Sequence, residues 1–238
     1  MKIDNKEMKV IESALLKIYS KYKNKGLLSV YLWGTVLTEE FNPELSDIDS
    51  IGIVNNTADE KDCDTIKNLL EKYAPKYKDF KLNYLYLNEL NGGRVRSRLA
   101  KVIPPSLLLL DFEHWKHIAG IKYSRENFKL EKISFDEAIR LNIDLIKKRH
   151  LPLIEQGDFK CTQYLIKSLL NICHYLNQKE KGKHNFRYNR VLKNSPKERK
   201  KVVEILLEIK QNKWDQQLMK KNFPFLIKFI NKLEEKRG

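Results

Sequence analysis

The sequence predicts an α/β (α+β) domain followed by an all-α helical bundle. Up to about residue 130, short apolar runs typical of strands alternate with amphipathic segments that have helical spacing. From Ser134 onward, nearly every segment has helical spacing. We therefore place the first domain at residues 1–130 and the helical domain at 131–238, because 238 residues are enough for two domains of ordinary size.

Three strands and four helices are expected in the first domain. Apolar residues recur at helical spacing from Met8 to Tyr22, and Gly26 then ends the helix. Apolar and polar residues alternate in the third strand, which begins at Phe80. In chain order, we expect a helix over 8–22, strands over 27–33 and 48–54 with a short helix over 35–41 between them, a helix over 59–73, a strand over 80–87 and a helix over 107–119.

The expected helices of the second domain have recognisable starts and stops. Ser134 with Glu137 three residues later predicts a capping box, and Ser195 followed by Pro196 predicts another helix start. Pro224 should interrupt or kink the last helix. The expected segments are helices over 134–154 and 158–179, a polar loop over 181–185, and a third helix from Ser195.

Composition limits the partners. The net charge is +15, which would suit a nucleic-acid binder, but the lysines are spread along the chain and outnumber the arginines, as an AT-rich genome produces. A nucleic-acid partner is therefore possible but not favoured. The three cysteines lack metal-ligand spacing, no apolar run approaches a membrane span, and the start of the chain lacks the apolar core of a signal peptide. We expect a cytoplasmic protein with free thiols and no membrane partner.

The most informative motif is a pair of aspartates at the start of the second strand. Asp47 and Asp49 stand one residue apart, so their side chains should project from the same face of the strand. Adjacent carboxylates repel each other, and such a pair is stable when a cation neutralises it. Carboxylate oxygens are suitable ligands for Mg²⁺, which is commonly held by one or two carboxylates together with substrate phosphates.

A second motif lies at the end of the first strand. Gly34 and Thr35 follow the apolar run and lead into the short helix, an arrangement suited to binding phosphate through backbone N–H groups. Metal-binding carboxylates beside a phosphate-binding turn suggest phosphoryl or nucleotidyl transfer. The alternative is a solvated turn between two strands, since the residues up to Ser46 include several turn formers.

Together, these residues resemble the nucleotidyltransferase superfamily that includes DNA polymerase beta. Within it, the chain looks most like the aminoglycoside adenylyltransferases of the streptomycin/spectinomycin type. The similarity is strongest over residues 30–54, weaker up to residue 90 and faint in the helical half. The resemblance implies a minimal nucleotidyltransferase domain with a small mixed sheet, followed by a helical bundle. It also implies Mg²⁺-dependent transfer of a nucleoside monophosphate, AMP from ATP being the first choice, to a hydroxyl of a small molecule such as an aminoglycoside-type antibiotic.

The resemblance also implies roles for individual residues. Asp47 and Asp49 would bind one or two Mg²⁺ ions, while Gly34, Thr35 and Ser46 would contact the triphosphate of ATP or another nucleoside triphosphate. In the helical domain, Arg187 follows a glycine-containing turn at a spacing similar to that of a basic residue that reaches the ATP phosphates in the family. The alternative for Arg187 is a solvated arginine in a basic loop.

One position departs from the family pattern. A third carboxylate usually lies on the next strand as metal ligand or general base, and the matching residue here is Asn83, a neutral amide that accepts no proton. Asp79 and Glu89 are the nearest carboxylates that could replace it, although both could simply be charges at the ends of a strand. We therefore retain two alternatives, namely a catalytically weak or inactive nucleotide-binding module and a nucleotidyltransferase that acts on RNA or protein.

Overall fold

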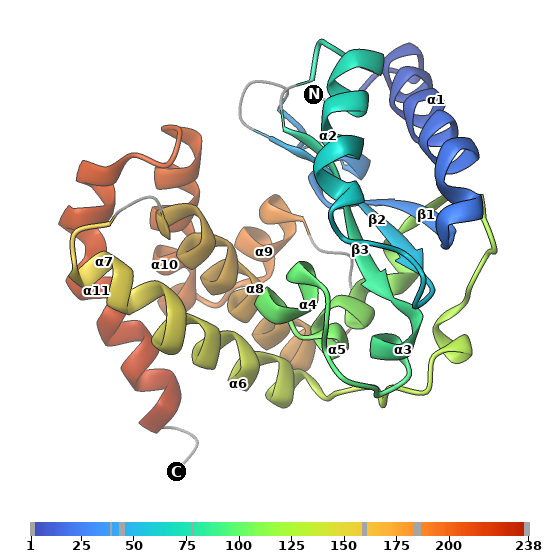
Figure 1. The fold of residues 1–238 in the computed structure, drawn as a ribbon. Helices are drawn as coiled ribbons and strands as arrows, with labels where there is room; N and C mark the ends of the chain where they lie inside the picture. Colours follow the sequence, from blue (N-terminus) through green and yellow to red (C-terminus); the bar gives the residue numbers. More distant parts are fainter. Residues whose placement is uncertain are drawn as a thin grey trace. The chain divides into compact units, whose positions relative to one another are not determined.

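The computed structural model describes residues 3–38, 40–42, 46–77, 79–158, 161–182 and 187–235. The chain divides into two compact units, Met1–Ile133 and Ser134–Gly238. The first unit combines a sheet with helices, and the described residues of the second form helices joined by short connections (Figure 1).

A small mixed sheet forms the centre of the first unit. Its strands are β1 (Leu27–Trp33), β2 (Ile48–Val54), β3 (Phe80–Tyr86) and β4 (Lys116–Gly120), in the order β3-β2-β1-β4. β1 pairs antiparallel with β2 and with β4, whereas β2 and β3 are parallel. The prediction of a small mixed sheet followed by a helical bundle is therefore confirmed, and β1 and β2 have the predicted bounds.

Two long helices cover one face of this sheet (Figure 1). α1 (Asn5–Tyr22) begins after Asp4, whose carboxylate caps the helix, and α2 is Asp62–Tyr73. Their apolar faces form one core with alternate residues of the strands. This core includes Ile11, Leu15, Ile18, Ile66 and Leu70 of the helices with Val30, Leu32, Leu82 and Tyr84 of the sheet.

The opposite face packs against short helices and a cluster of aromatic rings. The short helices are α3 (Leu87–Leu90), α4 (Arg98–Val102) and α5 (Pro105–Leu108). Tyr31 of β1 lies 5.3 Å from Phe112 and 6.0 Å from Trp115, measured between ring centroids. Because side chains alternate along a strand, this is also the face onto which odd-numbered residues such as Tyr31, Ile51 and Leu85 project.

Two sequence predictions in the first unit are wrong. The helix predicted over 107–119 stops early, because residues Lys116–Gly120 form β4 and pair with β1. The pairing Tyr31↔His117 is a long-range contact that the local helical spacing did not reveal. The short helix predicted over 35–41 is reduced to a single 3₁₀ turn, Thr35–Leu37, after which the chain becomes extended at Thr38.

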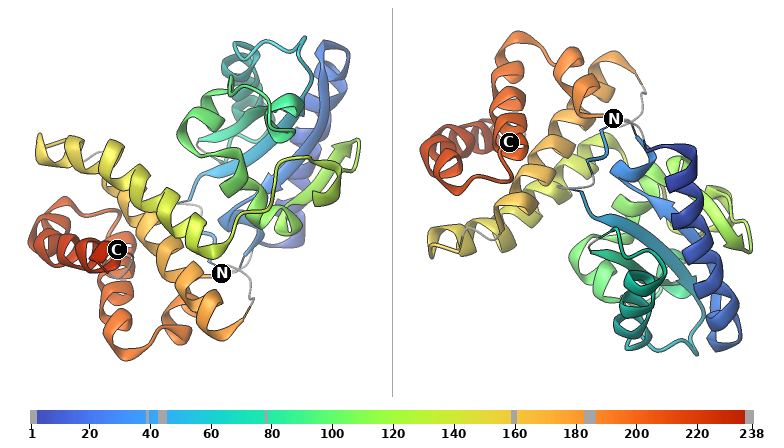
Figure 2. Two further views of the ribbon diagram at one scale, coloured as in Figure 1. Left: turned by 90° about the horizontal axis from the view of Figure 1, so that it is seen from below. Right: turned by 90° about the horizontal axis from the view of Figure 1, so that it is seen from above.

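The second unit is a bundle of helices, coloured yellow to red in Figure 2. Its helices are α6 (Phe135–Leu145), α7 (Leu151–Glu155), α8 (Thr162–Lys181), α9 (Tyr188–Asn194), α10 (Lys197–Gln211) and α11 (Gln216–Glu235). A π turn, Ile146–His150, joins α6 to α7 directly before Pro152, which lacks the N–H that an α-helix would use there. Most of the polar loop predicted over 181–185 lies outside the described residues. No helix in the described parts of the chain is long and apolar enough to span a membrane.

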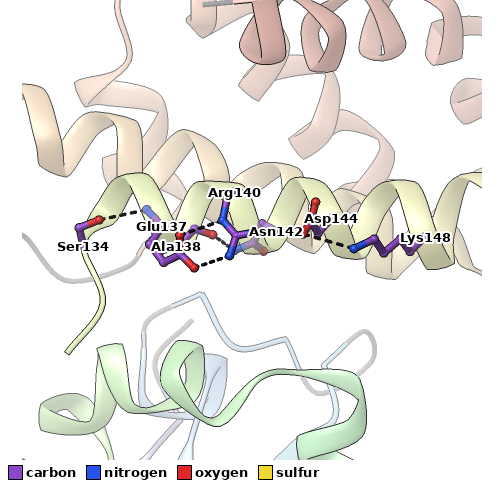
Figure 3. Close-up of polar contacts among 7 residues, drawn as sticks. All are labelled: Ser134, Glu137, Ala138, Arg140, Asn142, Asp144 and Lys148. Atoms are coloured by element: carbon purple, nitrogen blue, oxygen red, sulfur yellow. Dashed lines mark hydrogen bonds and ion pairs between the residues drawn. The ribbon is translucent and has the colours of Figure 1, made fainter. Parts of the chain in front are cut away.

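The predicted helix start at Ser134 is present, but the side chain of Glu137 pairs with Arg140 (Figure 3). The Ser134 hydroxyl accepts a hydrogen bond of 3.1 Å from the N–H of Glu137. The Glu137 carboxylate pairs with Arg140 one turn further along. The other predicted start is displaced by one residue, because Pro196 is the cap of α10 and Ser195 ends the additional helix α9.

Candidate active site

Asp47 and Asp49 point to a common cation. The ammonium of Lys81 lies 2.9 Å from Oδ2 of Asp47 and 3.4 Å from Oδ1 of Asp49. A single ammonium reaches both carboxylates, so the two side chains lie on the same side of the sheet. Their exposed fractions are 29% and 22%, which leaves each carboxylate accessible from solvent but partly shielded by its neighbours.

The register of the sheet explains this grouping. Asp49 of β2 is the partner of Lys81 in the parallel pair with β3 and of Trp33 in the antiparallel pair with β1. Directly opposed residues project from the same face of a sheet. Asp49 is therefore flanked by an indole on one side and an ammonium on the other, and Asp47 stands two residues before it at the same edge.

Electrostatics keep Lys81 charged. Burial on its own would lower the pKa of the Lys81 ammonium, but the carboxylates of Asp49 and Asp47 outweigh burial and raise that pKa. Lys81 is consequently a permanent cation at neutral pH, and it has no capacity to act as a general base there.

Gly34 provides an open turn beside the aspartates. It follows Trp33, the partner of Asp49, and it precedes the 3₁₀ turn Thr35–Leu37. Its φ of +83° lies in the left-handed region that favours glycine, and a Cβ atom placed there would meet nothing within 4 Å. The space above Gly34 is therefore open to a ligand, and the first N–H groups of a helical turn have no acceptor within that turn. Thr35 is half-buried in this position.

Ser46 belongs to the turn that precedes Asp47. Its hydroxyl accepts a hydrogen bond of 3.2 Å from the N–H of Asn42, and its own N–H donates to the Asn42 carbonyl at 2.7 Å. These two bonds join Asn42 to Ser46 just before β2 begins. Contact between Ser46 and a nucleotide stays a prediction.

Asn83 lies on the same face of the sheet as Lys81 and Asp49. It is two residues beyond Lys81 on β3 and is the partner of Ile51 in the parallel register. Its side chain is half-buried. Its assignment to the place of a third carboxylate stays a prediction, and its amide offers a neutral oxygen.

Neither alternative carboxylate is placed to replace it. Glu89 is 1% exposed, and its carboxylate accepts hydrogen bonds from the N–H groups of Tyr86, Arg96 and Ser97 and from the Ser97 hydroxyl. It therefore organises the loop that follows α3. Asp79 is exposed and pairs at 3.2 Å with Lys67 of α2, the helix on the opposite face of the sheet.

The carboxylate oxygens of Asp47 and Asp49 suit a magnesium ion whose other ligands are water and substrate oxygens. In residues 3–235, apart from the positions that the structure does not describe, no group of three or more His, Cys, Asp or Glu side chains is arranged to hold a metal. Two carboxylates on one face are nevertheless a common protein contribution to a Mg²⁺ site whose remaining ligands are water and phosphate oxygens. The chemistry of Asp47 and Asp49 therefore fits this ion.

Arg187 and Lys81 differ in how far their sequence context indicates a role at the site. Arg187 lies in the second unit, where it is the extended residue before α9, and its contact with ATP stays a prediction. Lys81 was missed, although the alternation over 80–87 places it on the polar side of its strand. Only the register between β2 and β3 reveals that it reaches the aspartates.

Comparisons with known proteins identify the fold. No protein-family model matches the chain, and no curated protein matches it. Among solved structures, it is similar to spectinomycin adenyltransferase AAD(9) from Enterococcus faecialis, crystallised with ATP and spectinomycin. The TM-score is 0.51 at 18% sequence identity, and the match covers 83% of this chain and 88% of that one. The chain therefore shares the fold of that solved structure.

Proposed function

We propose that this chain, whose fold is that of a nucleotidyltransferase, transfers a nucleoside monophosphate, AMP from ATP, to a hydroxyl of a small molecule. The observation that carries the proposal is the arrangement of Asp47 and Asp49, which share one cation at the edge of the sheet beside the open turn of Gly34. Three free cysteines fit a reducing compartment such as the cytoplasm.

In the proposed reaction, each residue has a limited task. Asp47 and Asp49 would hold one or two Mg²⁺ ions, and the backbone at Gly34 and Thr35 would hold a phosphate oxygen. The bound metal supplies positive charge that neutralises the triphosphate. The acceptor oxygen forms a bond to the α-phosphorus while the bond from that phosphorus to the bridging oxygen breaks, so pyrophosphate leaves and the hydroxyl proton is released.

The three residues considered as general base, Asn83, Glu89 and Asp79, are poorly suited to accept that proton. Asn83 has no basic group, Glu89 is committed to backbone donors, and Asp79 pairs on the other side of the sheet. A general base typically contributes about 10² to 10⁴-fold to a rate. We therefore propose a slow enzyme, in which two aspartates and an oriented acceptor suffice and the proton passes to water.

The first candidate acceptor is an aminoglycoside-type or aminocyclitol antibiotic. This choice follows from the similar solved structure, which was crystallised with spectinomycin as well as ATP. The net charge of +15 would attract a nucleoside triphosphate but disfavour a strongly cationic acceptor unless the acceptor pocket is locally acidic. An acceptor with few positive charges is the better first test.

A nucleotide-binding module without turnover is the second candidate. It is favoured by Asn83 at the position of the third carboxylate and by Lys81 between the two aspartates. Such a module would bind Mg²⁺-ATP and release no pyrophosphate. Transfer to RNA or protein would instead give labelling of a macromolecule by α-labelled ATP.

Pyrophosphate release separates these candidates. The chain is incubated with Mg²⁺-ATP and a panel of hydroxyl compounds that includes aminocyclitols, neutral sugars and nucleosides. We expect release with a subset of acceptors, and mass spectrometry should find that acceptor increased by the mass of one AMP moiety. ATP binding without release across the whole panel would favour the module and reject the enzyme.

A further inference from the structure

A lysine occupies the position between Asp47 and Asp49 at which a divalent cation is expected. Its ammonium is 2.9 Å from one carboxylate and 3.4 Å from the other. The side chain comes from the neighbouring strand β3, where the parallel register holds Lys81 directly beside Asp49. The contact is therefore built into the sheet.

The ammonium lowers the repulsion between the two carboxylates. Two negative charges with one positive charge among them leave a net charge of −1, in place of −2 for the aspartates alone. Because these side chains are only 22% to 37% exposed, solvent screens their interaction less than it would on an open surface. The register between β2 and β3 thus supplies the two carboxylates with a counter-ion from the protein itself.

A divalent cation and this ammonium compete for the same oxygen atoms. Mg²⁺ binds carboxylate oxygens at about 2.0–2.1 Å, whereas the ammonium now makes its closest contact at 2.9 Å. Two cations bound to the same pair of carboxylates would lie within a few ångströms of each other and repel. A metal bound to this pair would therefore repel the Lys81 ammonium from its present position.

We propose that Lys81 is a resident counter-ion of Asp47 and Asp49, which a divalent cation must displace, and that its ammonium then binds the triphosphate. The inference rests on the proposed function, because it takes the two aspartates as metal ligands. Lysine suits this task since its charge sits on a flexible four-carbon stem. A phosphate oxygen offers the displaced ammonium a new charge-assisted hydrogen bond.

Metal binding to variants tests the displacement. Mn²⁺ alone is titrated into the full chain, with free Mn²⁺ measured by electron paramagnetic resonance. Lys81→Met should bind Mn²⁺ about tenfold more tightly than the wild type, because the competing charge is gone and the aspartates repel each other unless a metal binds. Lys67→Met is the matched control, since Lys67 pairs with Asp79 and not with these aspartates, and it should behave as the wild type.

Nucleotide binding tests the second half of the proposal. In saturating Mg²⁺, Lys81→Met should bind ATP about tenfold more weakly than the wild type, because the ammonium no longer reaches a phosphate oxygen. The charge-retaining variant Lys81→Arg should keep most of the affinity for ATP. Opposite effects of Lys81→Met on Mn²⁺ and on ATP are specific to the proposal, since a folding defect would weaken both.

A measurement on the wild type keeps the test independent of how the variants fold. Acetylation of Lys81, followed by mass spectrometry with Lys67 as reference, should become faster when Mg²⁺ is added and slow again when ATP follows. Equal Mn²⁺ affinity of the wild type and Lys81→Met, or acetylation that ignores Mg²⁺, would overturn the proposal. If the counter-ion proposal is overturned but the wild type still shows Mg²⁺-dependent transfer, the proposed function stands. If Lys81→Met binds Mn²⁺ more tightly but the wild type shows no transfer, only the counter-ion role of Lys81 stands.

Discussion

Trp33 of β1 lies directly opposite Asp49 of β2, at the point where β1 ends and the chain turns through Gly34. This pairing ties the glycine turn to the aspartates through the register of the antiparallel pair. A phosphate held by the turn would therefore lie next to a metal held by the aspartates. The arrangement turns two separate sequence motifs into one candidate site.

Substitution of Gly34 should weaken both nucleotide binding and the fold. In Gly34→Ala, the added methyl group meets no atom within 4 Å, so the cost to folding comes from the backbone, whose φ of +83° and ψ of −157° suit glycine almost alone, and is about 1–3 kcal/mol. The methyl group points into the space where a phosphate would approach. We expect about a 10- to 150-fold loss of affinity for Mg²⁺-ATP by calorimetry, since a lost charge-assisted hydrogen bond costs roughly 1.5–3 kcal/mol.

Gly92→Ala is the matched control for this variant. Gly92 has the same φ of +83° and equally open surroundings, but it lies in the loop after α3. It should lose stability in urea unfolding because of its positive φ, and it should keep its affinity for ATP. Equal ATP affinities of the two variants would argue against a phosphate site at Gly34.

Asn83→Asp should increase transfer. The substitution restores a carboxylate on the face that carries Asp49, two residues beyond Lys81. A positioned base contributes about 10² to 10⁴-fold, and a tenfold gain in the rate of pyrophosphate release would already indicate that the site is otherwise competent. Asn88→Asp, on the short helix α3, is a control for the added negative charge. A variant with an unchanged rate would mean that position 83 does not face the reacting groups.

Glu89→Gln should destabilise the first unit without a specific effect on chemistry. The buried carboxylate accepts four hydrogen bonds. In the glutamine variant, the amide NH₂ would replace one acceptor oxygen and would face N–H or O–H groups that are themselves donors. We expect a loss of roughly 2–4 kcal/mol in the free energy of unfolding, measured by urea denaturation. The exposed Glu113 provides the control, since Glu113→Gln should leave stability unchanged. A loss of transfer per folded molecule of 100-fold or more would instead identify Glu89 as the base.

His150 should make the second unit less stable in acid. Burial in the π turn, assisted by the charge of Arg149, lowers the pKa of His150 to about 4 from the usual value near 6.5. Below about pH 6.5 the unfolded chain takes up a proton that the folded chain does not accept until about pH 4. Stability should therefore fall across this window by at most about 1.4 kcal/mol per pH unit.

Urea unfolding at several pH values measures this effect. The wild type and His150→Gln are compared between pH 7 and pH 4, with circular dichroism as the signal. The wild type should lose stability more steeply than the variant as the pH falls. Parallel slopes for the two proteins would indicate that His150 does not titrate differently in the folded and unfolded chains.

The local features of the fold were predictable, whereas the long-range pairings were not. β1 and β2 are short apolar runs bounded by turn residues, and this local pattern is enough to predict a buried strand. β4 depends on pairing with β1, a partner far away in the chain, so residues 107–119 read as a helix. The 3₁₀ turn after Gly34 is similarly shorter than its residue types suggested.

The same division holds at the site. Asp47 and Asp49 could be predicted because residues two apart in a strand share a face. Lys81 is 34 residues from Asp47 in the sequence, and its contact follows from the parallel register that no local pattern encodes. The burial of Glu89 likewise depends on a loop that folds back over α3 to donate hydrogen bonds.

Calorimetric titration of ATP tests the central claim most directly. ATP is titrated into the wild type and into the double variant Asp47→Asn/Asp49→Asn, in Mg²⁺ and in excess chelator, with Asp79→Asn as a control for the loss of an exposed carboxylate that pairs with Lys67 of α2. We predict that the wild type and Asp79→Asn bind ATP in a Mg²⁺-dependent manner, and that the double variant loses this dependence with about a hundredfold or greater loss of affinity. Wild-type affinity and Mg²⁺ dependence in the double variant would contradict the assignment of Asp47 and Asp49 as the metal–triphosphate site.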